Sequence, residues 1–278
     1  KKISIHIFRL MKNKKMHNAD LYEAPFDAST VTDINTWVYN NSRNMINGII
    51  DSFGKDDRMV LINTTAFEGQ WAEAFEESNV KEETFTSASG RKEKAKMMSA
   101  SGRIPLISLN GGKGFAKEYA GEDADHRIAF EALLPPEGMS AEEYAASLTG
   151  EDFVKAWEQR KQTEVSIKLP QFTYDYKASL EDALQDMGIR RAFSDAADLT
   201  GIAGLEDPLK IDAVLHKTHI ELDEKGTKAA AATAIVVKET SMAPGSAEEV
   251  FLDRPFVYAL VDTRTGIPLF LGIVNTVE

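Results

Sequence analysis

The chain has 278 residues, of which 43% are hydrophobic and 27% are charged, and its formal net charge is −12. This composition is typical of a soluble globular protein with a sizeable core. The acidic balance argues against nucleic acid or an anionic membrane as the main partner, because both need basic surface patches. There is no cysteine, which excludes a disulfide framework, a thiol nucleophile and a thiolate zinc site.

The first part of the chain alternates helical and extended patterns. Residues 8–17 form a short basic helical candidate, and residues 19–26 are predicted to be extended. Apolar residues recur at mostly helical spacing over residues 31–50, which predicts a helix capped near Ser29 or Thr30. No signal-peptide pattern precedes these segments, and we expect a processed chain or a fragment.

The middle of the chain is rich in predicted strands. Residues 59–71 are apolar on both faces at first, as in a strand buried centrally in a sheet, although Asn63 interrupts the run. Further elements are predicted as hairpin strands at 81–101, strands with glycine turns at 104–134, a helix at 140–160, a strand at 165–172 and a short helix at 180–187.

The last part of the chain carries the clearest strand patterns. Residues 213–223 alternate with period two, so that Val214, His216 and Ile220 share one mainly apolar face. Residues 256–261 and 267–274 are hydrophobic strands joined by DTRTG, a hairpin signal. Strands and helices are interspersed without βαβ regularity, which indicates an α+β fold.

The most unusual segment is EKGTKAAAATAIVVKETS, residues 224–241. The alternate positions Thr227, Ala229, Ala231 and Thr233 carry no charge, and Lys228 lies on the other face. A segment that serves first as a solvated loop and later as a buried strand needs this pattern, because burying an unpaired charge is costly. An alanine-rich helix or a plain loop is the alternative, since alanine is the best helix former.

Several sequence blocks, in this order along the chain, resemble the serpin family. The blocks are INTWV at 34–38, LINTTAFEGQW at 61–71, AKMM at 95–98, LPPEG at 134–138, KLPQF at 168–172, MGIRRAFSDAADL at 187–199, VLHKTHIELDEKGTKAAAATA at 214–234, DRPF at 253–256 and PLFLGIV at 268–274. The resemblance covers nearly the whole chain but starts partway into the family. The first helices and one strand of the family's main sheet have no counterpart.

The resemblance implies a single serpin domain over residues 1–278, with a large central mixed sheet, further sheets, surrounding helices and an exposed reactive-centre loop. It implies an inhibitor and not an enzyme. A target serine protease, or a cysteine protease, cleaves the loop and forms an acyl-enzyme, and the cut loop then inserts into the central sheet as a new strand. The same resemblance implies a secreted monomer that needs no cofactor or metal.

Residues of the loop's hinge follow from the resemblance. Glu224, Gly226 and Thr227 match the point where insertion begins, and Ala229 and Ala231 continue its uncharged inner face. In many relatives the residue matching Glu224 pairs with a lysine on a neighbouring strand. Gln171 stands at that site here, so we expect at most a hydrogen bond.

Three further residues match positions where the sheet opens. Asn63 and His216 match the shutter, where polar side chains join strands that must part. Trp71 matches the tryptophan of the breach, where the loop first enters. The alternatives are two buried polar residues satisfied by the backbone and an ordinary core aromatic.

The scissile bond is less well defined. Family spacing from Glu224 places it between Thr240 and Ser241, whereas counting back from DRPF indicates an insertion and leaves Lys238 and Met242 as alternatives. A β-branched or methionine residue suits elastase-like proteases, and Lys238 suits trypsin-like ones. A non-inhibitory serpin with a binding or structural role and an inactive fragment remain alternative functions.

Overall fold

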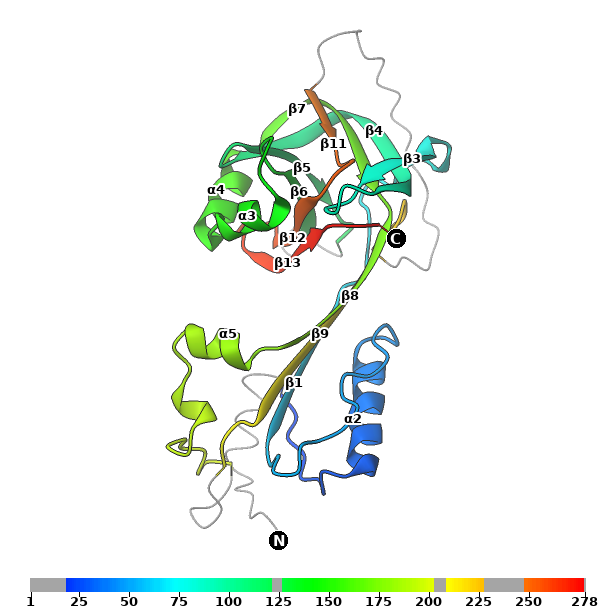
Figure 1. Ribbon diagram of the computed structural model, residues 1–278. Helices are drawn as coiled ribbons and strands as arrows, with labels where there is room; N and C mark the ends of the chain where they lie inside the picture. The colour runs from blue at the N-terminus through cyan, green and yellow to red at the C-terminus, as the bar shows by residue number, and fades with distance from the viewer. Residues whose placement is uncertain (1–18, 122–126, 203–208, 228–247, 278) are drawn as a thin grey trace. The chain divides into compact units, whose positions relative to one another are not determined.

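The computed structural model describes residues 19–121, 127–202, 209–227 and 248–277 (Figure 1). The chain divides into two compact units, one formed by residues 1–66 and 174–219 and the other by residues 67–173 and 220–278. The helix predicted for residues 8–17 lies outside the described residues.

The first unit contains helix α2 beside strand β1. Helix α2 spans Ala28–Asn41 and begins at Asp27, whose carboxylate accepts hydrogen bonds from the backbone N–H groups of Ser29 and Thr30. The cap therefore lies two residues before Ser29 and three before Thr30, the two positions predicted from the sequence. The helix ends earlier than predicted because Arg43 and Asn44 have positive φ angles, which a right-handed helix excludes.

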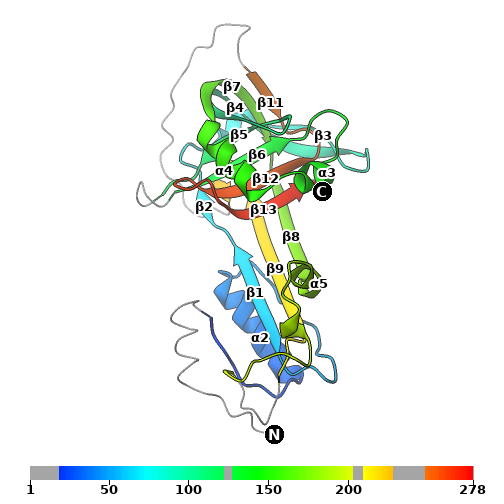
Figure 2. The same ribbon diagram turned by 90° about the vertical axis from the view of Figure 1, so that its left-hand side faces the viewer.

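Three strands accompany this helix. Strand β1 (Val60–Ala66) pairs in parallel with β9 (Ala213–Leu222), with Asn63 opposite His216, and β8 (Phe172–Ser179) pairs with β9 on its other side. Figures 1 and 2 both show α2 next to β1. Helix α5 (Glu181–Asp186) and the 3-10 helix η2 (Arg191–Phe193) follow β8.

The core of the first unit lies between α2 and the strands. Val38, Ile46, Ile49 and Ile50 are buried there, and Ile62 of β1 and Leu215 of β9 are among the partly buried residues packed against them. Both faces of β9 therefore carry apolar contacts, since Val214 on the opposite face is also buried. The sequence predicted only one apolar face for this strand.

An eight-stranded sheet dominates the second unit. Its strand order is β11-β7-β4-β5-β6-β12-β13, with β3 paired to β4. The strands are β3 (Val80–Thr86), β4 (Lys92–Leu109), β5 (Gly112–Glu118), β6 (Ile128–Leu134), β7 (Lys161–Pro170), β11 (Glu248–Phe251), β12 (Phe256–Asp262) and β13 (Pro268–Val274). The predicted hairpin of β12 and β13 is confirmed.

Two helices cover one face of this sheet. Helices α3 (Ala141–Ala146) and α4 (Gly150–Gln159) each begin with a capping box, at Ser140 and Thr149. The single helix predicted for residues 140–160 is therefore wrong, because the second capping box starts a new helix. Buried side chains of both helices, Tyr144 and Trp157 among them, join the core under β5, β6 and β12.

Short elements complete the second unit. The 3-10 helix η1 (Glu77–Asn79) precedes β3, and two-residue strands β2 (Gly69–Gln70) and β10 (Gly226–Thr227) pair antiparallel. Thr227 of β10 also pairs with Leu222 at the end of β9. The described residues thus form mixed sheets with few helices, and the predicted α+β class is confirmed.

Candidate functional site

The predicted hinge lies in a tight turn after β9. Asp223 and Gly226 close this turn, since the Asp223 N–H donates to the Gly226 carbonyl, and the Asp223 carboxylate accepts from the N–H groups of Lys225 and Gly226. Burial raises the pKa of the Asp223 carboxyl. This hydrogen-bonded turn fixes the direction in which the chain leaves β9.

Glu224 is held on both its side chain and its backbone. Its Oε2 accepts a hydrogen bond of 2.7 Å from Gln171 Nε2, and its carbonyl accepts one of 2.9 Å from the Phe75 N–H. Gln171 thus provides a neutral partner at this position. A neutral amide donor lacks the attraction between opposite charges that a lysine would add to its hydrogen bond with the Glu224 carboxylate.

Gly226 lies where no side chain fits. Its φ angle is +148°, and a Cβ atom there would lie 2.1 Å from the Gly69 carbonyl oxygen. The close approach of β10 to β2 therefore requires glycine. The sequence indicated Gly226 because glycine has a freely rotating backbone, and the structure adds this steric reason.

Thr227 is completely buried. Its Oγ1 and the hydroxyl of Tyr119 are 2.7 Å apart and form a buried hydrogen bond. Burial raises the pKa of the Tyr119 phenol far above its ordinary value, so the phenol stays protonated. The hydroxyl pair satisfies two polar groups that would otherwise be buried without partners.

Trp71 links the hinge to an aromatic cluster. Its indole Nε1 donates to the Asp223 carbonyl at 3.0 Å, and its backbone N–H donates to the Lys225 carbonyl at 2.9 Å. The ring stacks on Tyr119 with a centroid distance of 4.4 Å and meets Phe75 edge-on at 6.1 Å. Trp71 is thus a buried core aromatic and also a direct neighbour of the hinge.

A cation completes this cluster. Lys117 Nζ lies 4.6 Å from the ring centroid of Phe75 and 5.6 Å from that of Trp71. Burial lowers the pKa of Lys117 to about 8, although the nearby charge of Glu73 opposes the shift. Lys117 and Tyr119 were not among the residues predicted from the sequence, where their only signal is their alternation with Phe115 along the strand.

The predicted shutter residues lie in the first unit and contact each other. His216 Nδ1 and Asn63 Oδ1 are 2.8 Å apart, joining β9 to β1 by a side-chain hydrogen bond. Asn63 is exposed and His216 is partly buried, whereas the alternative to a shutter expected both side chains to be buried and satisfied by the backbone. On the other face of β9, His219 Nδ1 lies 3.0 Å from Asp175 Oδ1, a contact that the sequence did not indicate.

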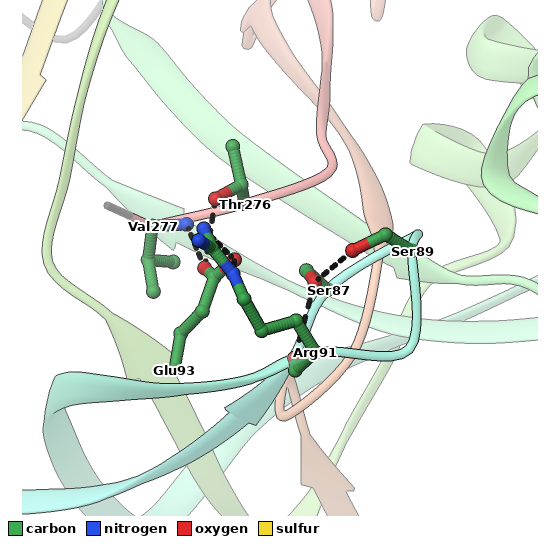
Figure 3. A network of polar contacts seen from close by, with 6 residues as sticks. All are labelled: Ser87, Ser89, Arg91, Glu93, Thr276 and Val277. Atoms are coloured by element: carbon green, nitrogen blue, oxygen red, sulfur yellow. Dashed lines mark hydrogen bonds and ion pairs between the residues drawn. The ribbon is translucent and has the colours of Figure 1, made fainter.

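A separate polar cluster holds the C-terminal segment (Figure 3). The Glu93 carboxylate, at the start of β4, accepts hydrogen bonds from the Thr276 hydroxyl at 2.7 Å and the Val277 N–H at 2.9 Å. Arg91 forms an ion pair of 2.9 Å with the same carboxylate. These hydrogen bonds outweigh the effect of burial and hold the pKa of Glu93 at about 2.

Several predicted positions lie outside the described residues. They are the hinge residues Ala229 and Ala231 and the scissile-bond candidates Lys238, Thr240, Ser241 and Met242. Among the described residues, no three acidic or histidine side chains gather in a way that could hold a metal ion. Within the same residues, no helix has the length and apolar character needed to cross a bilayer.

Comparison with known proteins decides the family. The family model described as serpin (serine protease inhibitor) matches residues 9–277. The chain belongs to the serpin family. Serpins are generally protease inhibitors and not catalytic enzymes, although some members are non-inhibitory.

The similar proteins come from distant organisms. Iripin-3 of Ixodes ricinus is 31% identical over 264 residues, which cover 93% of this serpin and 66% of Iripin-3. An uncharacterized serpin-like protein of Thermococcus kodakarensis is 30% identical over 88% of this serpin and 56% of its own length. This serpin thus spans about two thirds or less of the length of these curated relatives.

Solved serpin structures share the fold. The native state of Tengpin, a thermophilic serpin, matches with a TM-score of 0.85 and 36% identity, covering 94% of this serpin and 66% of Tengpin. Thyroxine-binding globulin complexed with thyroxine matches with a TM-score of 0.84 at 22% identity, covering 99% of this serpin and 72% of that chain. At this level of identity, the similarity to thyroxine-binding globulin shows the fold alone.

Proposed function

We propose that the protein inhibits serine proteases as a suicide substrate. The target protease cuts one bond in the reactive-centre loop, which begins at residue 224, and the cut loop then inserts into the central sheet. The observation that carries the proposal is the hinge, where a buried Thr227 follows a glycine that no other residue can replace. Thr227 already occupies a strand position, β10, at the end of β9. Insertion then requires the residues after it to continue that strand and the paired strands β1 and β9 to separate.

The uncharged inner face of the segment supports the same proposal. Ala229 and Ala231 continue the sequence alternation that begins at Thr227, and the charged Lys228 does not belong to that alternation. An inserted strand of about a dozen residues gains backbone hydrogen bonds worth roughly 0.5–1.5 kcal/mol each. The sum is comparable with the stability of a whole domain, about 5–15 kcal/mol, and suffices to distort a bound protease.

The proposed roles of the surrounding residues follow from their contacts. Trp71 holds the chain on both sides of Glu224, so it guides the first step of entry, and the Glu224–Gln171 hydrogen bond holds the hinge until the loop is cut. Asn63 and His216 form a bond between β1 and β9 that must break when a strand enters between them. We propose a monomeric protein that needs no metal or cofactor.

The position of the scissile bond and the class of the target protease are also proposals. Cleavage between Thr240 and Ser241 suits elastase-like proteases, whereas cleavage after Lys238 suits trypsin-like ones, and Met242 is a further candidate. A cysteine protease is a second target class. Secretion is also proposed and not established, since the family has both secreted and intracellular members.

Incubation with elastase and with trypsin tests the proposal. A complex that survives SDS and contains both proteins is expected, and the mass of the released C-terminal peptide identifies the scissile bond. Cleavage of the loop with no such complex would refute inhibition by this chain. That outcome would assign it to the non-inhibitory serpins or to inactive fragments.

A further inference from the structure

Lys117 projects from β5 onto two aromatic rings in the second unit. Its Nζ lies 4.6 Å from the ring centroid of Phe75 and 5.6 Å from that of Trp71. Both distances are within the roughly 6 Å over which a ring face attracts a cation. Within the part of the chain that the structure describes, Lys117 makes no hydrogen bond or ion pair. These two rings are therefore the main contacts of its ammonium group.

Lys117 changes its charge near neutral pH, whereas its neighbours do not. Burial lowers the pKa of Lys117 to about 8, although the charge of Glu73 opposes the shift. Tyr119, two residues further along the chain, stays protonated, and Phe130, which pairs with Lys117 on β6, carries no charge. At a pKa of about 8, roughly nine tenths of the ammonium groups are charged at pH 7 and roughly one tenth at pH 9.

The residues that carry these two rings also hold the hinge turn. The indole and backbone N–H groups of Trp71 donate to the carbonyls of residues 223 and 225, at 3.0 and 2.9 Å. The Phe75 N–H donates to the carbonyl of residue 224 at 2.9 Å. Three consecutive carbonyls of the turn are thus bound by the two residues whose rings contact the ammonium group.

We propose that Lys117 is a positioning residue, whose ammonium group fixes the rings of Trp71 and Phe75 and, through them, the turn of residues 223–226. Loss of the charge weakens the attraction to both rings and lets the turn open more often. A cation beside a desolvated ring shifts such an equilibrium by roughly 2- to 30-fold. The consequence for loop entry rests on the proposed function, because a turn that opens more often releases the hinge more readily.

A second tryptophan of the same unit provides an internal reference. The Trp157 Nε1 donates to the Thr263 carbonyl at 2.8 Å, and the Arg160 guanidinium lies 3.8 Å from the centroid of the Trp157 ring. Arginine keeps its charge at every pH used with proteins. The protection of this indole against hydrogen exchange is therefore not expected to follow the charge of Lys117.

Glu131 changes its charge over the same pH range and has to be removed as a cause. Burial raises the pKa of Glu131 to about 8, and the charge of Arg160 opposes the shift. Because Arg160 contacts the reference indole, ionisation of Glu131 would disturb the reference. The experiment therefore uses the Glu131→Gln variant as the parent protein.

Hydrogen exchange of the indole Nε1–H groups of the intact chain, followed by nuclear magnetic resonance from pH 7 to 9, tests the proposal. Base catalysis is common to both indoles, so it cancels in the ratio of Trp71 protection to Trp157 protection. This ratio should fall by roughly 2- to 30-fold as Lys117 loses its proton. Lys117→Arg should keep the ratio high at every pH, and Lys117→Met should lower it already at pH 7 and make it independent of pH. Lys94→Met removes a lysine whose side chain is 81% exposed and should follow the parent.

A ratio that stays constant with pH in the parent, or a Lys117→Arg variant that shows the same decline, would overturn the proposal. If Lys117→Met does not fold, the parent and Lys117→Arg still decide between these outcomes. The backbone amide of Phe75 reports on the turn itself, and its protection should follow that of the Trp71 indole. A response of the indole without a response of this amide would also overturn the proposal. No protease is used, so these results are separate from the outcome of the inhibition experiment.

Discussion

The buried hydroxyl pair at the hinge gives the most specific prediction. Thr227 is completely buried, and its Oγ1 lies 2.7 Å from the hydroxyl of Tyr119, which is itself 2% exposed. The substitution Thr227→Val keeps the size of the side chain and removes its hydroxyl. The Tyr119 hydroxyl then stays buried without this partner, which costs about 1–3 kcal/mol of unfolding free energy.

The reverse substitution and the double variant complete a cycle. Tyr119→Phe leaves the Thr227 hydroxyl unpaired and should cost a similar amount. In the double variant both partners are apolar, so its stability should return close to that of the parent protein. The coupling between the two sites, which is the sum of the two single losses minus the loss in the double variant, is therefore expected to be about 2–6 kcal/mol.

Thermal denaturation followed by circular dichroism measures these effects. For a chain of this size, 1 kcal/mol shifts Tm by roughly 2–4 °C, so each single variant should melt about 2–12 °C lower. The double variant should melt within a few degrees of the parent. Strictly additive losses in the double variant would refute the assignment of this pair as a hydrogen bond that stabilises the hinge.

Three further predictions concern single side chains. Gly226→Ala should destabilise the fold more than Gly188→Ala, as measured by urea denaturation. Only the methyl group at position 226 would meet a backbone oxygen, that of Gly69 at 2.1 Å. The pKa of Glu93 is lowered from 4.5 to about 2, so its contribution to stability is present above pH 4.5 and is lost as pH falls toward 2. Glu93→Gln should weaken this acid dependence of Tm, whereas Glu82→Gln, at an exposed ion pair, should not. Burial raises the pKa of Glu131 from 4.5 to about 8. The free energy of unfolding should therefore fall by up to about 1.4 kcal/mol per pH unit as pH rises from 4.5 to 8. If Glu131 causes this fall, the Tm of the Glu131→Gln variant should not change over the same pH range.

Patterns confined to one element were predictable from the sequence. The period-two alternation of residues 213–223 indicated β9, and the two apolar runs around DTRTG indicated the β12–β13 hairpin. The break between α3 and α4 was also predictable, although it was missed. Ser140 and Thr149 each precede an acidic residue by three positions, which is the signal of a capping box.

Features that depend on tertiary neighbours were not predictable from one sequence. Lys117 differs from other strand lysines only because Trp71 and Phe75 lie beneath it, and Glu131 only because its face of β6 is completely buried. Likewise, the sequence showed Gly226 as a flexible position, whereas the nearby carbonyl of β2 requires a glycine there. Such contacts join residues far apart in the chain, which periodicity does not report.

Strand insertion by the loop is the central claim, and thermal stability before and after loop cleavage tests it most directly. We expect the cleaved protein to melt at a clearly higher temperature than the intact one, because the inserted strand adds backbone hydrogen bonds. The substitution Ala231→Arg should abolish this gain, since its charge faces inward in the inserted strand, whereas the matched Ala230→Arg should preserve it. An unchanged or lower melting temperature after cleavage of the unsubstituted chain would contradict the account.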